Sequence, residues 1–214
     1  MKLIENINEI EFNNFVKKNC STFMQTSYFG EINKFKNLNY HLVGLEDNNK
    51  ILATAMILEK KLIKNITYLY IPRGFVTDFN NKTIVNTFIN ELKKFGKKRK
   101  AIFISIDPEI ILKIDNKEQN INLNLKNYGF KHLGFNYYFE NRQPRFTYCL
   151  NLKDNYINNF HATTKKIYNK GNLYNLEISK GNKDKIKDFY NLMLETGIRN
   201  DVIFFKKDYY QNFY

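Results

Sequence analysis

Two charged residues stand directly after strand-like segments, where an α/β sheet gathers its ligands. Arg73 lies in the turn of residues 70–74 (YIPRG). Proline fixes φ there and glycine allows otherwise strained backbone, so the Arg73 side chain is expected to project in a defined direction. Asp107 follows the apolar run Ala101–Ile106, and ligands collect at such strand ends in α/β sheets. Both positions are therefore candidates for ligand binding.

Each candidate also has a structural explanation. Arg73 fits a solvated side chain in a loop that ends a strand. Asp107 fits the N-cap of a following helix, with Pro108 at the first helical position. The basic run of residues 93–100 (KKFGKKRK) could touch phosphates, or it could be a solvated helix end, where cations suit the helix dipole. The residues alone leave these alternatives open.

Familiar catalytic and cofactor signatures are missing. The chain has no GxGxxG, no P-loop and no GxSxG, and each of its nine glycines stands alone. The short glycine-rich turn that holds the pyrophosphate of acetyl-CoA is also missing, which argues against ordinary acetyl transfer. Two cysteines lie far apart and three histidines are scattered, so neither a disulfide framework nor a metal site is expected. We expect no cofactor and no metal.

The net charge of +13 permits anionic partners without choosing among them. Of the 34 basic residues 29 are lysine and five are arginine, and asparagine and isoleucine are abundant. An AT-rich coding sequence would give this mixture, so part of the basic balance reflects codon usage. The remainder attracts polyanions such as tRNA, nucleotide sugars and anionic lipid head groups.

The length of 214 residues fits one large domain, or one domain and part of a second. A hydrophobic fraction of 43% is that of a globular protein with a core of its own. No apolar run reaches the ~18–20 residues that span a bilayer. Polar residues follow Met1 at once, so no signal-peptide core is visible. These features favour a soluble cytoplasmic protein.

The hydrophobic pattern predicts a mixed α/β domain over residues 1–142, with an Asn48-Asn49 hairpin turn and Ala101–Ile106 as a strand buried on both faces. Gly129 suits the left-handed position after a helix. The expected helices are residues 8–18, a second one capped by Thr26 or Ser27, 81–94 and 121–128, and the other expected strands are residues 41–45, 51–58 and 66–71.

Residues 143–214 resemble the opening of a second α/β unit. Strands are expected at residues 146–152 and 176–179, and helices at 154–170, at 183–195 and from Lys206. About 70 residues hold too few strands for the usual sheet of ~4–6 strands. We therefore expect this second unit to be incomplete, with apolar surface left exposed from Arg145 onward.

Taken in order, several segments resemble the Fem family of aminoacyl-tRNA-dependent peptidoglycan peptidyltransferases. No segment is specific alone, but together they extend over nearly the whole chain. The matching segments are residues 23–32 (FMQTSYFGEI), 70–76 (YIPRGFV), 102–109 (IFISIDPE), 143–147 (QPRFT), 150–152 (LNL), 189–201 (FYNLMLETGIRND) and 208–210 (DYY).

The resemblance implies an acetyltransferase-like (GNAT-type) mixed sheet flanked by helices, followed by part of a second domain of the same type. It also implies an enzyme that moves an amino acid from aminoacyl-tRNA to the stem-peptide amine of a UDP-linked or lipid-linked muropeptide. An acyl donor that is a tRNA ester explains the missing acetyl-CoA turn. A lipid-linked acceptor would add peripheral contact with the inner membrane face to the cytoplasmic location.

The resemblance also assigns roles to single residues. Asp107 matches an aspartate of the acceptor site, where it would orient the acceptor amine or take its proton, since an amine must be neutral to attack an ester. Tyr209 matches a tyrosine that contacts the acceptor, and Arg73 stands in the matching Pro-Arg-Gly loop. Arg199, in the segment 189–201, is a further expected substrate-binding residue.

Two positions depart from the family pattern. A lysine that would hold acceptor phosphate aligns with Asn33, and Lys34 stands beside it. An arginine expected shortly before Tyr209 aligns with Phe205, and Lys206 stands beside it. A neighbouring lysine supplies charge without the bidentate geometry of arginine. Lys34 and Lys206 are therefore the expected phosphate-binding substitutes.

Two other functions stay open from the sequence. Compared with the matching family, the second unit of this chain is expected to be cut short. One alternative is therefore a non-catalytic remnant that binds tRNA or muropeptide. Another N-acyltransferase of the same superfamily, with a different amine acceptor, is the second. Transfer activity separates the first alternative from the leading hypothesis, and the identity of the acceptor separates the second.

Overall fold

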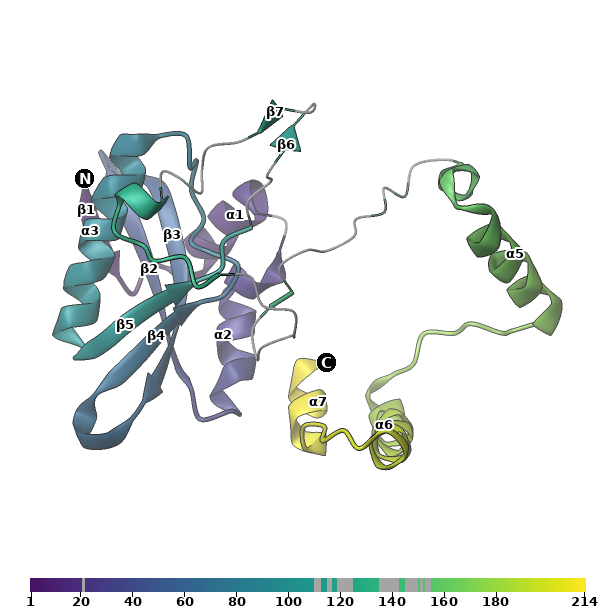
Figure 1. The fold of residues 1–214 in the computed structure, drawn as a ribbon. Coiled ribbons are helices and arrows are strands. Elements are labelled where there is room, and N and C mark those ends of the chain that lie inside the picture. Colours follow the sequence, from purple (N-terminus) through teal and green to yellow (C-terminus); the bar gives the residue numbers. More distant parts are fainter. Residues whose placement is uncertain are drawn as a thin grey trace. The chain divides into compact units, whose positions relative to one another are not determined.

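The computed structural model describes residues 1–20, 22–109, 113–114, 117–118, 125–134, 143–144, 150, 152 and 155–214 (Figure 1). The chain divides into two compact units, Met1–Gln143 and Pro144–Tyr214.

The first unit is built on a sheet whose described strands stand in the order β1-β2-β3-β4-β5. Neighbours from β1 to β4 are antiparallel, and β4 and β5 are parallel. A short antiparallel pair, β6 and β7, forms a separate two-stranded sheet. The strands are β1 (Lys2–Glu5), β2 (Asn39–Asp47), β3 (Lys50–Lys61), β4 (Thr67–Ile71), β5 (Ala101–Ile106), β6 (Lys113–Ile114) and β7 (Lys117–Glu118).

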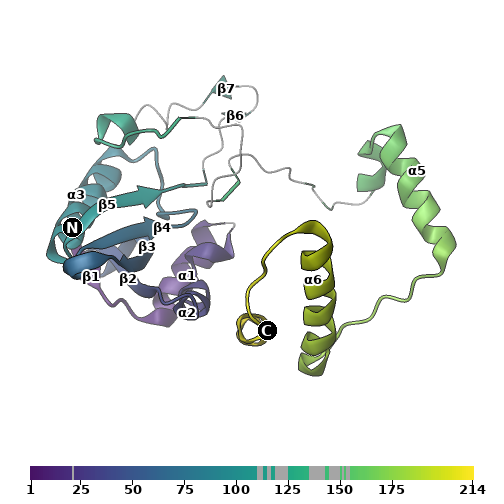
Figure 2. The same cartoon turned by 60° about the horizontal axis from the view of Figure 1, so that its bottom comes forward.

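Helices cover both faces of this sheet, as Figures 1 and 2 show from two sides. α3 (Lys82–Lys98) packs on one face, and α1 (Glu9–Asn19) and α2 (Ser27–Lys34) pack on the other. Two short 3₁₀ helices, η1 (Phe23–Gln25) and η2 (Ile63–Asn65), complete the described helical elements of this unit before β5. The predicted mixed α/β fold, with a sheet flanked by helices, is confirmed.

The core follows from strand alternation. In β3, Ala53, Ala55 and Ile57 point to the α3 face, and Met56 and Leu58 point to the α1 and α2 face. All five are buried. The two hydrophobic faces of β3 therefore hold the three helices on opposite sides of one sheet.

Local sequence signals set several boundaries. Asn8 caps α1 by accepting from the backbone N–H groups of Ile10 and Glu11. Thr26 caps α2, and Asn81 caps α3. Asn48 and Asn49 both have positive φ, as a tight hairpin turn between β2 and β3 requires.

The second unit has helical elements at η3 (Tyr156–Asn159), α5 (Ala162–Gly171), η4 (Asn172–Tyr174), η5 (Lys183–Lys185), α6 (Ile186–Asn200) and α7 (Lys207–Phe213). α6 and α7 are joined through aromatic contacts of Tyr210 with Phe189 and Tyr190, at ring distances of 5.5 and 5.9 Å. Large side chains such as Ile178 and Ile203 are 94% and 99% exposed. That this unit begins a second acetyltransferase-like domain stays a prediction.

Two predicted elements need correction. β5 is a strand, but it lies at the edge of the described sheet and not between two neighbours, and Ile102 and Phe103 are more than half exposed. A continuous apolar run does not separate an edge strand from a central one. The strand predicted at residues 176–179 is irregular chain, because no described strand pairs with it.

Other predictions fall partly outside the described residues. The strand predicted at residues 146–152 lies almost entirely outside the described residues. The first half of the helix predicted at residues 121–128 also lies outside them. The end of that helix is described, and Gly129 after it has φ of +88°, as its left-handed position predicts.

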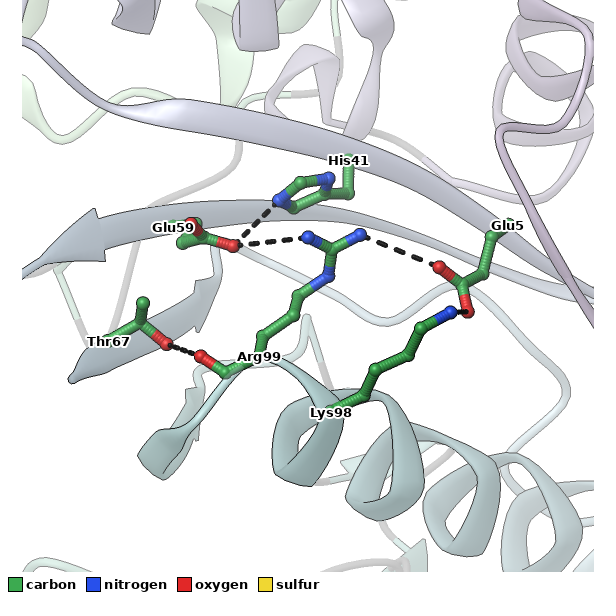
Figure 3. Close-up of polar contacts among 6 residues, drawn as sticks. All are labelled: Glu5, His41, Glu59, Thr67, Lys98 and Arg99. Carbon is green, nitrogen blue, oxygen red and sulfur yellow. Dashed lines mark hydrogen bonds and ion pairs between the residues drawn. The ribbon is translucent and has the colours of Figure 1, made fainter. Parts of the chain in front are cut away.

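An ion-pair network joins the end of α3 to residues of β1, β2 and β3 (Figure 3). Arg99, at the end of α3, pairs with Glu59 and with Glu5 at 3.5 Å each, and Lys98 pairs with Glu5 at 3.0 Å. His41 lies 2.9 Å from the buried Glu59 carboxylate. Part of the basic run of residues 93–100 is therefore engaged within the protein, which supports its interpretation as a helix end.

The network predicts a pH-dependent stability. Burial and the charge of Arg99 lower the pKa of His41 below its ordinary value of 6.5, against the opposite effect of Glu59. The unfolded chain therefore takes up a proton at a higher pH than the folded chain. The free energy of unfolding should be highest above pH 6.5 and fall as the pH drops below it.

His41→Gln keeps an amide donor for Glu59 and removes the titration. Chemical denaturation between pH 5 and 8 should show a flatter pH profile for this variant than for the native chain. His132→Gln, at an exposed site, is the matched control and should retain the native slope. An unchanged slope in His41→Gln would contradict this account.

Candidate functional site

The ends of the two parallel strands bring Asp107 next to the Arg73 turn. Ile71 of β4 and Ile106 of β5 are paired in register, so the residues that follow both strands leave the same edge of the sheet. Asp107 Oδ1 accepts from the backbone N–H of Arg73 at 2.7 Å. Asp107 Oδ2 accepts from the Tyr70 hydroxyl, also at 2.7 Å. One carboxylate thus joins β4, the turn after it and the end of β5.

The turn depends on this carboxylate. Arg73 has φ of +53°, a left-handed conformation that is unfavourable for a residue with a side chain. A hydrogen bond from its N–H to an ionised carboxylate is charge-assisted and therefore stronger than one to a neutral acceptor. The Asp107 bond offsets the backbone strain at Arg73.

Burial shapes the electrostatics of the pair. Burial raises the pKa of Asp107 above that of an ordinary carboxyl, while the bonds from Tyr70 and Arg73 and the Arg73 charge act in the opposite direction. Burial and the neighbouring carboxylate also raise the pKa of the Tyr70 hydroxyl far above its ordinary value. Tyr70 therefore stays protonated and donates to Asp107, which is a stronger base than an exposed aspartate.

The structure gives Asp107 no helix to cap within the described residues. Residues 107–109 are not helical, and both carboxylate oxygens bond to residues that precede it in the chain. Tyr70 is the partner that sequence reasoning missed. Tyr70 is the first residue of the segment 70–76. Because successive residues of a strand point to opposite faces, Tyr70 lies on the face opposite to the buried Leu69 and Ile71, and this alternation was a signal for it.

Lys34 lies in α2 and is engaged locally. Its ammonium forms an ion pair with Glu31 at 2.8 Å and lies 5.1 Å from the centre of the Tyr40 ring. Asn33, which aligns with the family's lysine, is buried and donates to the carbonyl of Phe29 at 2.8 Å. The amide at position 33 is thus part of the core, and only Lys34 offers a cation at the surface there.

The other predicted residues belong to the second unit. Tyr209 lies in α7 and lines a pocket of ≈ 520 Å³ together with residues of η5, α6 and α7. Its ring stacks on Phe205 at 4.4 Å, and burial raises the pKa of its hydroxyl. Lys206 precedes α7 and Arg199 lies in the last turn of α6, and both are exposed outside this pocket.

In the described part of the chain, no group of three His, Cys, Asp or Glu side chains could hold a metal ion. No described helix is both long enough and apolar enough to cross a membrane.

The first unit is thus a mixed sheet with helices on both faces and a parallel pair at its end. The sequence profile of the FemAB family matches residues 7–214, and the chain belongs to this family.

Relatives of the family match between 72% and 100% of the chain. The lipid II:glycine glycyltransferase of Staphylococcus epidermidis is 26% identical over 98% of this chain and 51% of its own. The aminoacyltransferase FemA of the same organism is 32% identical over 72% of this chain and 40% of its own. The crystal structure of FemX superposes with a TM-score of 0.86 at 27% identity, over 100% of this chain and 54% of its own. The chain thus spans about half the length of these relatives.

The Tyr70–Asp107 bond gives a direct prediction. Tyr70→Phe removes a donor from a half-buried carboxylate, so the unfolding free energy should fall by about 1–2 kcal/mol. The pKa of Asp107 should rise further, because the hydroxyl favours the ionised form. Thermal unfolding and a carbon-detected NMR titration measure the two effects.

Tyr68→Phe is the matched control, because it removes a hydroxyl from the same strand two residues earlier. It should leave the Asp107 pKa nearly unchanged. Equal effects of the two substitutions on that pKa would contradict the proposed bond.

Proposed function

We propose that the protein is an aminoacyltransferase that moves an amino acid from aminoacyl-tRNA to the stem-peptide amine of a peptidoglycan precursor. The observation that carries the proposal is the half-buried Asp107 carboxylate at the ends of the parallel strands, beside the Arg73 turn, in a chain of the FemAB family. The names of the relatives, a glycyltransferase acting on lipid II and an aminoacyltransferase, support the same reaction class.

The reaction needs a neutral amine and a place for its proton. The acceptor nitrogen attacks the ester carbonyl carbon, so that a C–N bond forms and the C–O bond to the terminal ribose of the tRNA breaks. One proton leaves the nitrogen and one reaches the departing ribose oxygen. A raised pKa suits Asp107 for taking the first proton or holding the ammonium before it is lost.

Asp107 keeps capacity for this role. Each carboxylate oxygen has two acceptor positions, and the bonds from Tyr70 and Arg73 occupy one on each oxygen. The four positions exceed these two bonds and the contact of the carboxylate with its own backbone N–H, so the carboxylate can still accept from an amine. No cofactor enters the proposed reaction.

The proposed substrates are both anionic, and the net charge of +13 favours their encounter with the protein. Arg73, Lys34, Lys206 and Arg199 are proposed to contact their phosphates, and Tyr209 to contact the acceptor. A lipid-linked acceptor would bring the protein to the inner membrane face, whereas a UDP-linked acceptor would not.

Two measurements test the function. The protein is incubated with tRNA charged with a radiolabelled amino acid and with either a UDP-linked or a lipid-linked muropeptide, and transfer and binding are followed together. We expect labelled muropeptide and an affinity that falls with salt. Binding without transfer would favour a non-catalytic remnant, and transfer to a different amine would favour another N-acyltransferase. The absence of both binding and transfer would contradict the proposal.

Asp107→Asn separates catalysis from structure. The amide oxygen can still accept from the Arg73 N–H, and the Tyr70 hydroxyl can turn to accept from the new amide group. The thermal midpoint should therefore change little, while the loss of charge and base should slow transfer by about 10²-fold. Near-native transfer with a native midpoint would leave Asp107 a purely structural role.

A further inference from the structure

Gln25 is a fully buried polar residue that the proposed reaction does not use. It ends η1, at a relative exposure of 0%. Its amide nitrogen donates to the Pro72 carbonyl at 2.6 Å and to the Met56 carbonyl at 3.3 Å, and its amide oxygen accepts from the Met56 N–H at 3.0 Å. One side chain thus bonds to the middle of β3 and to the turn after β4.

The turn is shaped to receive this amide. A Cβ atom at Gly74 would overlap the amide group of Gln25, so that any larger residue would displace one or the other. Glycine at position 74 is therefore required by the close approach of Gln25, in addition to the flexibility that a turn needs.

The contacts form a continuous chain from Gln25 to Asp107. Gln25 holds the carbonyl of Pro72, and the next residue, Arg73, donates its N–H to Asp107 Oδ1. The conformation of Pro72 and Arg73 thus has one anchor on each side. If the Gln25 anchor is lost, the left-handed Arg73, with φ of +53°, loses one of the bonds that hold its turn and keeps the Asp107 bond.

We propose that Gln25 is a positioning residue for the candidate active site. It fixes the Pro72–Arg73–Gly74 turn so that the Arg73 N–H and side chain and the Asp107 carboxylate keep one geometry. The catalytic part of this inference rests on the proposed function, whereas the effect on the turn does not.

A purely space-filling role does not account for the contacts. An apolar side chain of similar volume would fill the site, but it would leave the Met56 N–H and the Pro72 carbonyl without this buried partner. The amide instead has both its donor and its acceptor groups directed at backbone atoms of two different elements.

The test compares two buried amides of the same region. Gln25→Met keeps the length of the side chain and removes its hydrogen bonds. Asn33→Leu is the control, since Asn33 is also buried but donates to Phe29 in α2 and has no recorded bond to the turn. Both should lower the thermal midpoint. The discriminating readouts are the hydrogen exchange of the Arg73 amide and the kcat of aminoacyl transfer.

We expect Gln25→Met to accelerate Arg73 exchange and to lower kcat, each by about tenfold, the equivalent of one hydrogen bond. KM should change less than kcat. Asn33→Leu should leave both quantities near those of the native protein. Equal effects of the two variants on Arg73 exchange would overturn the proposal. If the native protein transfers no amino acid but Gln25→Met still accelerates Arg73 exchange, the result counts against the proposed function and not against the effect of Gln25 on the turn.

Gln25→Glu keeps the test decisive if the methionine variant does not fold. Its ionised form lacks the donor for the Pro72 carbonyl, and its protonated form regains one. At each pH, the exchange rate of the Arg73 amide in Gln25→Glu is compared with that in the native protein. The two rates should therefore approach each other as the pH falls. A difference that does not depend on pH, or no difference at all, would overturn the positioning role.

Discussion

The hydrogen bonds of the Asp107 carboxylate hold together the ends of two parallel strands. β4 and β5 are joined along their length by backbone bonds, but the chain leaves both strands at residues 71 and 106. At this end, the Tyr70 hydroxyl in β4 and the N–H of Arg73 in the following turn both donate to the Asp107 side chain, which follows β5. The Asp107 bond supports the left-handed conformation of Arg73.

The rest of the first unit serves as the frame for this junction. β3 provides Met56 as an anchor for Gln25, and the helices on both faces bury β3 and β4. At the opposite end of the parallel strands, the Thr67 hydroxyl donates to the backbone carbonyl of Arg99. The guanidinium of Arg99 forms an ion pair with Glu59 (Figure 3). Polar and charged groups thus hold both ends of β4, and the Asp107 end also carries the left-handed Arg73 turn.

Much of the frame could be predicted from the sequence, because its signals are local. Asn8, Thr26 and Asn81 mark helix starts, and alternation of apolar residues marks β3. The edge position of β5 could not be predicted, since the exposure of Ile102 depends on which strand lies beside it.

The candidate site was predictable only in part. Asp107 and Arg73 follow strands, and this position alone made them candidates. The bonds of Tyr70 and Gln25 join residues 37 and 47 positions apart, and no local pattern encodes such contacts. The engagement of Lys34 by Glu31 was visible in principle, because a spacing of three residues on a helix brings opposite charges together.

The position of the acceptor amine tests the central claim most directly. A crystal structure of the protein with a bound UDP-linked muropeptide would locate the amine nitrogen relative to Asp107. The account predicts that this nitrogen lies within about 2.6–3.2 Å of an Asp107 carboxylate oxygen, with the Tyr70 and Arg73 bonds intact. An amine bound out of reach of Asp107, either directly or through one water molecule, would contradict it.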